Sequence, residues 1–430
     1  MLSSLAAGIA VPLLLILWSA EGRLRRSPWP GIVAIVWYGL RLARDAAANV
    51  RAPREWDYAC FWLYGHIAAA HQNVYDPAVF AHFPSPFTPS DGFRAAVLDV
   101  GFPYPPPSIG LFVPFAFIHG VSTGLAVWYC VQFAALAGAA WLLARAFMPA
   151  DGWRSACLVL ALIVALPASL MNVADAQTNF LLLLLVALAL HGRRSAAGAV
   201  WQTLAIWVKP YTAVLLLLDI LRGRARRLIV AGITALASLL AAAVVLGPAT
   251  FAAYLHADPA AREPSFAFAE VVNQSLLAIV LRLHAVLPPH VSIFHEPLYL
   301  AGTALLTALT LALCTRTRTR RGGELEFALL LLLGLLVYPG SLSSYGVVLI
   351  VPLLVVWRHR AGLPGGARAA ALLVGLAVIL QSAVLQRGFE ANALIWIACA
   401  YLLLRERSEP RIAPLPSLRP AAARPVEIAR

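Results

Sequence analysis

The feature that most limits this fold is a series of long apolar runs separated by short polar connections. One run covers residues 2–20 and another covers residues 228–246. The chain is 61% hydrophobic and only 12% charged, whereas a soluble domain carries roughly 25% charged residues. A helix of about 20 apolar residues spans the hydrocarbon layer of a bilayer. The sequence therefore predicts an all-α membrane protein, a polytopic helical bundle of about 11–13 transmembrane helices.

The order of the apolar runs divides the chain into predicted regions. Residues 106–119 are apolar but too short to classify as a span, so a re-entrant or interfacial segment is an equal alternative. Asp57 to His71 has the spacing of an interfacial helix. The predicted regions are two N-terminal spans in 1–47, a first extracytoplasmic catalytic loop at 48–105, a transmembrane bundle at 106–404 with a second outer loop at 247–275, and a disordered cytoplasmic tail at 405–430.

Positive charge gathers at the ends of the apolar runs, as at 222–227 and 316–321. This is the positive-inside pattern, so the net charge of +13 indicates orientation in a cell inner (plasma) membrane and no nucleic-acid partner. The arginine-poor polar connections would then face outward. The exceptions, which border the loop placed outside, are Arg41, Arg44, Arg51 and Arg54.

Cysteine usage gives no sign of a disulfide framework. The five cysteines show no paired spacing, and most lie in apolar runs, where thiols act as small hydrophobic groups. The sequence therefore predicts no metal site and no cofactor.

Lys209 is the only lysine in a chain with 33 basic residues, and it lies within the apolar sequence AIWVKPYTAV. An ammonium inside a membrane segment is costly and is a functional-site candidate by default. Snorkelling to an interface is the alternative, but the flanking arginine clusters are roughly a dozen residues away, or about 18 Å of helix. We therefore favour a functional role, with a phosphate as the natural partner. The following Pro210 predicts a break in the span.

Asp57 opens the predicted interfacial helix in an aromatic setting. Its carboxylate could act as a general base toward an acceptor hydroxyl, or could bind a divalent metal together with Glu55. It could also be a helix N-cap, which spacing alone favours. A local role is likewise the simplest interpretation of the Tyr75–Asp76–Pro77 turn and of the rigid Tyr104–Pro107 corner.

Three further polar segments fall on the same predicted face as Asp57. Residues 175–179 (DAQTN) hold four polar side chains in five residues, more than a helix cap needs, so sugar or phosphate binding is an equal alternative. Asn273–Gln274–Ser275 ends the second outer loop, with Arg282 about two helical turns farther on. Residues 338–345 (YPGSLSSY) form a polar break between two apolar runs, which is also consistent with a simple turn.

Taken in this order over residues 50–360, the motifs resemble those of glycosyltransferase family 87. They are the Asp57 loop with Tyr75–Asp76, FPYPPP at 102–107, AQTN at 176–179, Lys209–Pro210, Asn273–Ser275 and a late P-x-S at 339–341. The family consists of polytopic enzymes of the GT-C fold, including phosphatidylinositol mannoside mannosyltransferases. The resemblance implies an extracytoplasmic active site and inverting transfer from a polyprenyl-phosphate sugar donor to a lipid or glycan acceptor.

The resemblance also implies roles for individual residues. Asp57 would be the catalytic base, and Lys209 with Arg282 would bind the donor phosphate. Two departures stand out: the family's usual glycine before Gln177 is Ala176 here, and the Trp and His that follow the late serine are missing, with Tyr345 as a candidate replacement. The set expected to line the sugar and acceptor site is Tyr75, Asp76, Tyr104, Gln177, Asn179, Asn273, Gln274 and Tyr345.

The leading hypothesis is therefore an integral-membrane hexosyltransferase. Mannose is the family's best-known donor sugar, although nothing in these residues selects it. A transporter or flippase for lipid-linked glycans is the alternative from another class, but it would spread its polar residues over both leaflets. A non-catalytic polyprenyl-phosphate binder is a third hypothesis, which the altered late motif leaves open.

Overall fold

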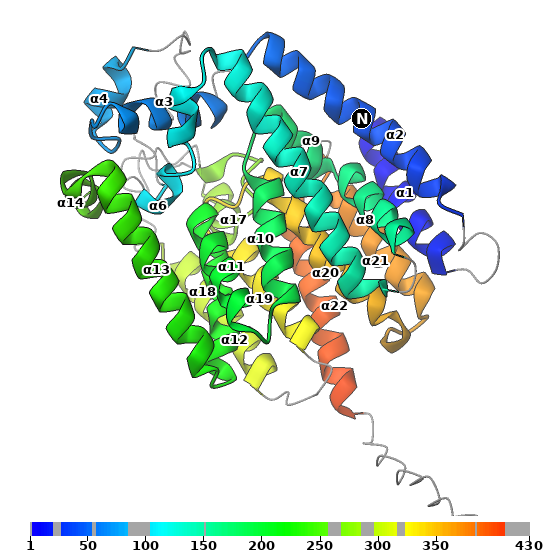
Figure 1. Cartoon of the computed structure of the whole chain (residues 1–430). Helices are drawn as coiled ribbons and strands as arrows, with labels where there is room; N and C mark the ends of the chain where they lie inside the picture. Colours follow the sequence, from blue (N-terminus) through cyan, green and yellow to red (C-terminus); the bar gives the residue numbers. More distant parts are fainter. Residues whose placement is uncertain are drawn as a thin grey trace, which may run out of the picture.

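The structure is a computed structural model, and the chain folds into a bundle of helices (Figure 1). The part of the chain that the structure describes contains no β-strand, only an isolated bridge between Asn273 and Leu342. The predicted all-α class is therefore confirmed. The described residues are 2–19, 27–53, 57–84, 104–149, 152–256, 268–284, 296–315, 323–382 and 385–408.

Most of the described residues lie in helices, several of which are short 3-10 segments. The helices of the N-terminal half are α1 (Leu2–Ser19), α2 (Trp29–Arg51), α3 (Asp57–Ala69), α4 (Pro77–His82), α6 (Pro106–Ile109), η2 (Val113–Phe117), α7 (Val121–Phe147), α8 (Trp153–Ala165), α9 (Pro167–Ala174) and α10 (Asn179–His191). Those of the C-terminal half are α11 (Ala196–Val208), η4 (Pro210–Leu215), α12 (Leu216–Leu221), α13 (Ala225–Leu246), α14 (Pro248–His256), α17 (Leu276–Arg282), α18 (Pro297–Thr315), α19 (Gly323–Val337), η6 (Ser343–Leu349), α20 (Ile350–Arg358), η7 (Arg360–Gly362), α21 (Ala367–Leu380) and α22 (Gly388–Ser408).

The apolar helices differ in what covers them. Every side chain of α19 from Glu324 to Leu336 is buried, because α12, α18, α20, α22 and η4 surround this helix. By contrast, only 11% of the most apolar window of α13 is buried, and its exposed stripe includes Ile233, Leu236 and Leu240. An exposed apolar stripe of this length needs lipid as its solvent. The chain is a multi-pass membrane protein whose core helix is α19.

Four helices of the described chain are long and apolar enough to cross a membrane: α7, α13, α18 and α22. The pair α8–α9, bent by 70°, would make a fifth, and seven further apolar segments are shorter, with 10–17 residues each. The predicted total of 11–13 spans therefore stays a prediction. The amphipathic helix α2 is not among the candidate spans, since its second half carries three arginines and an aspartate.

The structure confirms two predicted local features. The helix α11 ends at Val208 and η4 begins at Pro210, so the break falls at Lys209 as predicted. The helix predicted from Asp57 to His71 forms as α3, and its interfacial location stays a prediction. Residues 106–117 form the two short helical segments α6 and η2. The tail prediction needs a correction at its start, because α22 extends to Ser408 through packing against α19, α20 and η7. The rest of that tail, Glu55 and residues 85–103 lie outside the described residues.

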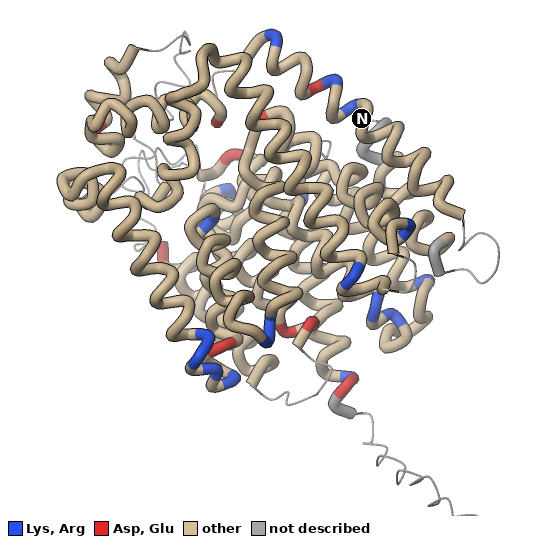
Figure 2. Tube along the Cα trace, viewed as in Figure 1, with Lys and Arg blue, Asp and Glu red and all other residues tan. Residues whose placement is uncertain are grey.

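Charged side chains are concentrated toward the ends of the bundle. In Figure 2 the lower end holds a dense group of blue and red residues around α12 and α19, whereas α13 carries charge only near that end. The arginines of α2 lie at the opposite end, where α3 begins. We call the lower group, which contains Asp219, Glu324 and Glu326 with their arginine partners, the arginine end.

Candidate active site

Lys209 lies at the centre of the candidate site. Its side chain is 2% exposed, and the ammonium donates hydrogen bonds to Tyr345 Oη (2.8 Å), Gln177 Oε1 (3.3 Å) and the hydroxyl of Tyr104. These groups come from four separate parts of the chain that the sequence analysis identified one by one. All three acceptors are neutral, so they solvate the ammonium without neutralising its charge.

The backbone explains why Lys209 points into the bundle. Lys209 caps the C-terminus of α11 in an extended conformation, and Pro210, which has no N–H, begins η4. The helical hydrogen-bond ladder is therefore interrupted at this residue. The ring of Tyr211 stacks on that of Tyr345 at 5.6 Å, which fixes the hydroxyl that accepts from Lys209. An interrupted helix thus places a cation inside an apolar bundle.

Asp57 is the acidic group of this site. It is the first described residue of α3, and its carboxylate interacts electrostatically with Lys209 and forms a hydrogen bond with the Gln177 side chain. Burial raises the pKa of Asp57 above its usual range, although Lys209 and Gln177 each favour the ionised form. Asp57, Gln177 and Lys209 therefore form one cluster of a base, an amide and a cation.

The loop that presents Gln177 is held from three sides. Asn49 donates to the carbonyls of Val173 (3.1 Å) and Ala174 (3.0 Å), and Tyr129 Oη donates to Val173 O (2.6 Å). Trp128 Nε1 donates to Ala176 O at 2.7 Å. These donors bind carbonyls of the last turn of α9 and of the loop that follows it. The loop that carries Gln177 is therefore rigidly positioned.

Ala176 occupies the position before Gln177 where the family usually has glycine. Its φ is +51°, in the left-handed region that favours glycine, and the residue is buried. A glycine would adopt this conformation without the steric conflict of a Cβ. The conformation is retained here with an alanine, because the donors of Asn49, Trp128 and Tyr129 fix the surrounding carbonyls.

Asn179 begins α10 directly after this loop. Its backbone N–H donates to Asn172 Oδ1 at 3.0 Å. Both polar atoms of its side-chain amide are buried and have no hydrogen-bond partner among the described residues. Because unpaired buried amides are rare in folded proteins, this amide suits a polar ligand such as a sugar hydroxyl.

The two later motifs are joined by backbone hydrogen bonds. Gln274 N donates to Ser341 O at 2.6 Å, and Ser343 N donates to Val272 O at 2.8 Å. The side chains of Asn273 and Ser275 both donate to Pro339 O. Asn273 therefore holds the segment that carries Tyr345, while the buried Gln274 side chain lies against Gly388.

Arg282 is placed differently from Lys209. Its guanidinium donates to the carbonyls of Glu270 (3.0 Å) and Asn273 (3.3 Å). Burial lowers the pKa of Arg282, while Glu390 raises it and Arg387 lowers it further. None of the hydrogen bonds within the described residues joins Arg282 to Lys209. Its predicted part in phosphate binding therefore stays a prediction.

The Tyr75–Asp76 turn has the local role that its spacing favours. Asp76 caps α4, its carboxylate accepting from Ala78 N at 2.9 Å. Tyr75 is buried, and its hydroxyl donates to Tyr104 O at 2.8 Å. Tyr75 therefore supports the backbone of a residue that contacts Lys209 directly.

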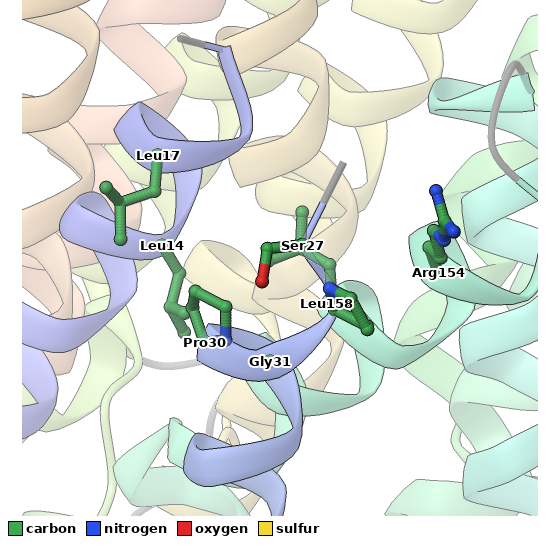
Figure 3. Close-up of a pocket in the computed structure, with 8 residues that line it drawn as sticks. Leu14, Leu17, Ser27, Pro30, Gly31, Arg154 and Leu158 are labelled. Atoms are coloured by element: carbon green, nitrogen blue, oxygen red, sulfur yellow. The ribbon is translucent and has the colours of Figure 1, made fainter. Parts of the chain in front are cut away.

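One pocket lies at the candidate site and another lies away from it. A small pocket beside Asp57 is lined by Asn49, Tyr58, Ala174 and Asp175 among others. The pocket in Figure 3, between α1, α2 and α8, is lined by Leu14, Leu17, Ser27, Pro30, Gly31, Arg154 and Leu158, none of which belongs to the Lys209 cluster. No group of three or more metal-ligating side chains occurs among the residues that the structure describes.

Sequence reasoning missed the residues that position the site. Asn49 lies on the buried face of the amphipathic helix α2, and Trp128 and Tyr129 lie in the apolar helix α7. Nothing in their spacing distinguishes them from ordinary core residues. The one available signal is that Asn49 is an amide on an apolar helix face, which requires a buried partner.

Comparison with known proteins adds one finding. The model of glycosyltransferase family 87 matches residues 102–344, which is more than half of the chain. The matched range contains Tyr104, Gln177 and Lys209, ends one residue before Tyr345, and does not include Asp57. No curated protein and no solved structure matches the chain.

Proposed function

Because the chain belongs to glycosyltransferase family 87, we propose that this membrane glycosyltransferase takes its sugar from a polyprenyl-phosphate donor and transfers it to a hydroxyl of a lipid or glycan acceptor. The sugar would be a hexose, with mannose as the first donor to test. Transfer would occur on the extracytoplasmic face of the inner (plasma) membrane, because the arginine end faces the cytoplasm under the positive-inside rule.

The observation that carries this proposal is the environment of Lys209. The hydrogen bonds of this buried ammonium go to neutral acceptors, so its direct contacts include no carboxylate that would compete with an anionic ligand. The phosphate of a lipid-linked sugar donor would supply such an anion. Because Lys209 is buried, an electrostatic interaction there is stronger than at the surface.

The arrangement of Asp57 and Lys209 suits inverting transfer. Asp57 accepts the proton of the acceptor hydroxyl, whose oxygen attacks the anomeric carbon of the donor while the bond from that carbon to the phosphate oxygen breaks. The leaving group is polyprenyl phosphate, whose added negative charge Lys209 stabilises. A phosphate departs as an anion without protonation, so a second carboxylic acid, which glycosidases need, is not required.

The tyrosines and amides complete the proposed roles. The Tyr345 hydroxyl accepts from Lys209 and can donate its own proton to a phosphate oxygen. Gln177 fixes Asp57 relative to Lys209, and the unpartnered amide of Asn179 would bind the sugar. Tyr104, Asn273 and Gln274 are proposed to hold sugar or acceptor oxygens, with Tyr75 and Asp76 supporting that wall.

The direct test is sugar transfer by purified full-length protein in lipid, with a panel of radiolabelled polyprenyl-phosphate sugars. We expect the wild type to transfer one sugar and Asp57→Asn to lose about 10²–10⁴-fold in rate, because the amide cannot accept the proton. Asp76→Asn is the matched control, since Asn also caps helices and should retain most activity.

Two results would contradict the proposal. One is full activity of Asp57→Asn. The other is movement of labelled lipid across vesicles by the wild type without any sugar transfer, which would establish a transporter.

A further inference from the structure

The outward face of α2 is an uncovered apolar stripe. Trp29, Val33, Val36, Trp37 and Leu40 are between 51% and 71% exposed. Their spacing of four, three, one and three residues places them on one side of the helix. These residues line a groove along the helix surface. The opposite face, which includes Tyr38, Leu42 and Asn49, packs on α7, α8 and α9.

Arginines continue the same stripe toward the end of the bundle that holds Asp57. Arg44 and Arg51 are exposed, and the helical repeat places both on the face of Leu40, while Arg41 lies at its edge. Arg41 and Arg44 also line the groove. The one acid of α2 is Asp45, which pairs with Arg44 at 3.3 Å in an exposed contact. This part of α2 therefore keeps an excess of positive charge.

The position of these arginines within a bilayer needs an explanation. Trp29 and Arg44 are separated by fifteen residues, or about 22 Å along the helix, which is less than the ~30 Å hydrocarbon thickness. If Trp29 lies at one interface, Arg44 lies short of the other. A guanidinium on the lipid-facing side at such a depth snorkels toward the interface, where lipid phosphate groups lie. These residues also include most of the exceptions to the positive-inside pattern.

We propose that the outer face of α2 binds an anionic glycerophospholipid of the surrounding bilayer. Its acyl chains lie along the groove from Trp29 to Leu40, and its phosphate accepts hydrogen bonds from Arg41 and Arg44. Guanidinium groups suit this role because they bind phosphate oxygens in a bidentate manner. The site goes beyond sugar transfer and does not depend on it.

Charge and position favour this occupant over the others. A second copy of the chain seated on the same face would bring arginines against arginines, which is unfavourable. The donor phosphate has its own cation, Lys209, and Asn49 marks the side of α2 that faces the catalytic cluster. The stripe lies on the other side of the helix. A zwitterionic lipid carries its own cation and gains less from two arginines.

The test uses full-length protein in nanodiscs of phosphatidylcholine with increasing phosphatidylglycerol, and native mass spectrometry of the lipids that stay bound. We expect the wild type to retain phosphatidylglycerol in preference to phosphatidylcholine. The double variant Arg41→Gln/Arg44→Gln should lose about 25-fold of that preference, since each arginine contributes about fivefold. Trp37→Ala should weaken retention of both lipids, because it removes groove surface only.

The matched control is Arg145→Gln/Arg368→Gln, which removes two exposed arginines from the other end of the bundle. It should bind phosphatidylglycerol as the wild type does. Unchanged preference in the α2 double variant would overturn the proposal, as would an equal loss in the control. Arginine-dependent displacement of phosphatidylglycerol by polyprenyl phosphate, or a dimer cross-linked through α2, would also overturn it in favour of the donor or a second copy.

Discussion

The two ends of the bundle treat buried charge in opposite ways. At the arginine end, Asp219 contacts Arg227 (2.8 Å) and Arg224 (3.2 Å), and Glu324 contacts Arg193 (3.3 Å) and Arg358 (3.4 Å). Glu326 pairs with Arg222. The other region, which we call the Lys209 end, contains Lys209 with Tyr104, Gln177 and Tyr345. There the ammonium contacts two hydroxyls and an amide. At the arginine end the cations contact carboxylates directly, whereas at the Lys209 end the cation contacts neutral groups.

This difference distinguishes structural charge from functional charge. Guanidinium groups with carboxylates on facing helices satisfy each other and hold the helix ends together. An ammonium that neutral groups solvate costs stability, because its burial is not offset by an opposite charge in direct contact. The protein keeps this destabilising buried ammonium at its one lysine, which indicates a ligand site.

Removing the cation tests the Lys209 end. Lys209→Met should lower the rate of sugar transfer by about 10²–10³-fold, because the departing phosphate loses the ammonium proposed to stabilise its charge. The variant should remain folded, since removal of the buried ammonium offsets the loss of its electrostatic interaction with Asp57. Transfer rates and thermal unfolding, measured on the same preparation, check both outcomes. A variant that transfers sugar normally would assign Lys209 a structural role.

Removing a carboxylate tests the arginine end. Asp219→Asn should destabilise the protein by about 3 kcal/mol, because Arg227 is left buried without its counter-ion. Sugar transfer per folded molecule should be unchanged. The measurement is thermal unfolding in detergent together with the transfer rate. A loss of transfer without a loss of stability would show that the two ends do not differ as described.

The pH dependence of transfer tests the environment of Asp57, which lies in α3, outside the candidate spans. A base must be ionised, so the rate should fall about tenfold per pH unit below the pKa of Asp57. Burial raises that pKa, so the fall should begin at higher pH than for an ordinary aspartate. Gln177→Met should move it higher still, since Gln177 favours the ionised form. A rate that stays flat down to pH 4 would exclude Asp57 as the base.

The smallest effect is expected at Ala176. Ala176→Gly should stabilise the protein by less than about 1 kcal/mol, because glycine adopts the positive φ without steric cost but loses more entropy on folding. Sugar transfer should be maintained, since the carbonyl that Trp128 holds is unchanged. Thermal unfolding of Ala176→Gly beside Ala174→Gly, a helical control position, distinguishes the relief of strain from a general effect of glycine. Equal destabilisation of both variants would contradict the strain at Ala176.

The sequence was sufficient for the fold class and for the parts of the site that are polar within apolar surroundings. Lys209, Gln177 and Tyr345 stand out for that reason, and the break at Pro210 follows from its missing N–H. Their meeting in one cluster depends on how distant segments pack, which periodicity does not encode. The family resemblance suggested their order but not their contacts.

Other features were beyond sequence reasoning. The helices α13 and α19 are similarly apolar, yet one faces lipid and the other is the core, because neighbouring helices decide what is covered. The family resemblance implied a part in phosphate binding for Arg282, and that part stays a prediction. The hydrogen bonds from its guanidinium to the carbonyls of Glu270 and Asn273 depend on tertiary packing, which the sequence pattern does not encode.

The most direct test of the account is the affinity of purified protein in nanodiscs for polyprenyl phosphate, the product that carries no sugar. We predict that Lys209→Met binds it at least about tenfold more weakly than the wild type. Asp57→Asn should bind it as tightly or more tightly, because a neighbouring negative charge is removed. If Lys209→Met binds polyprenyl phosphate as the wild type does, Lys209 does not hold the donor phosphate and the account is wrong.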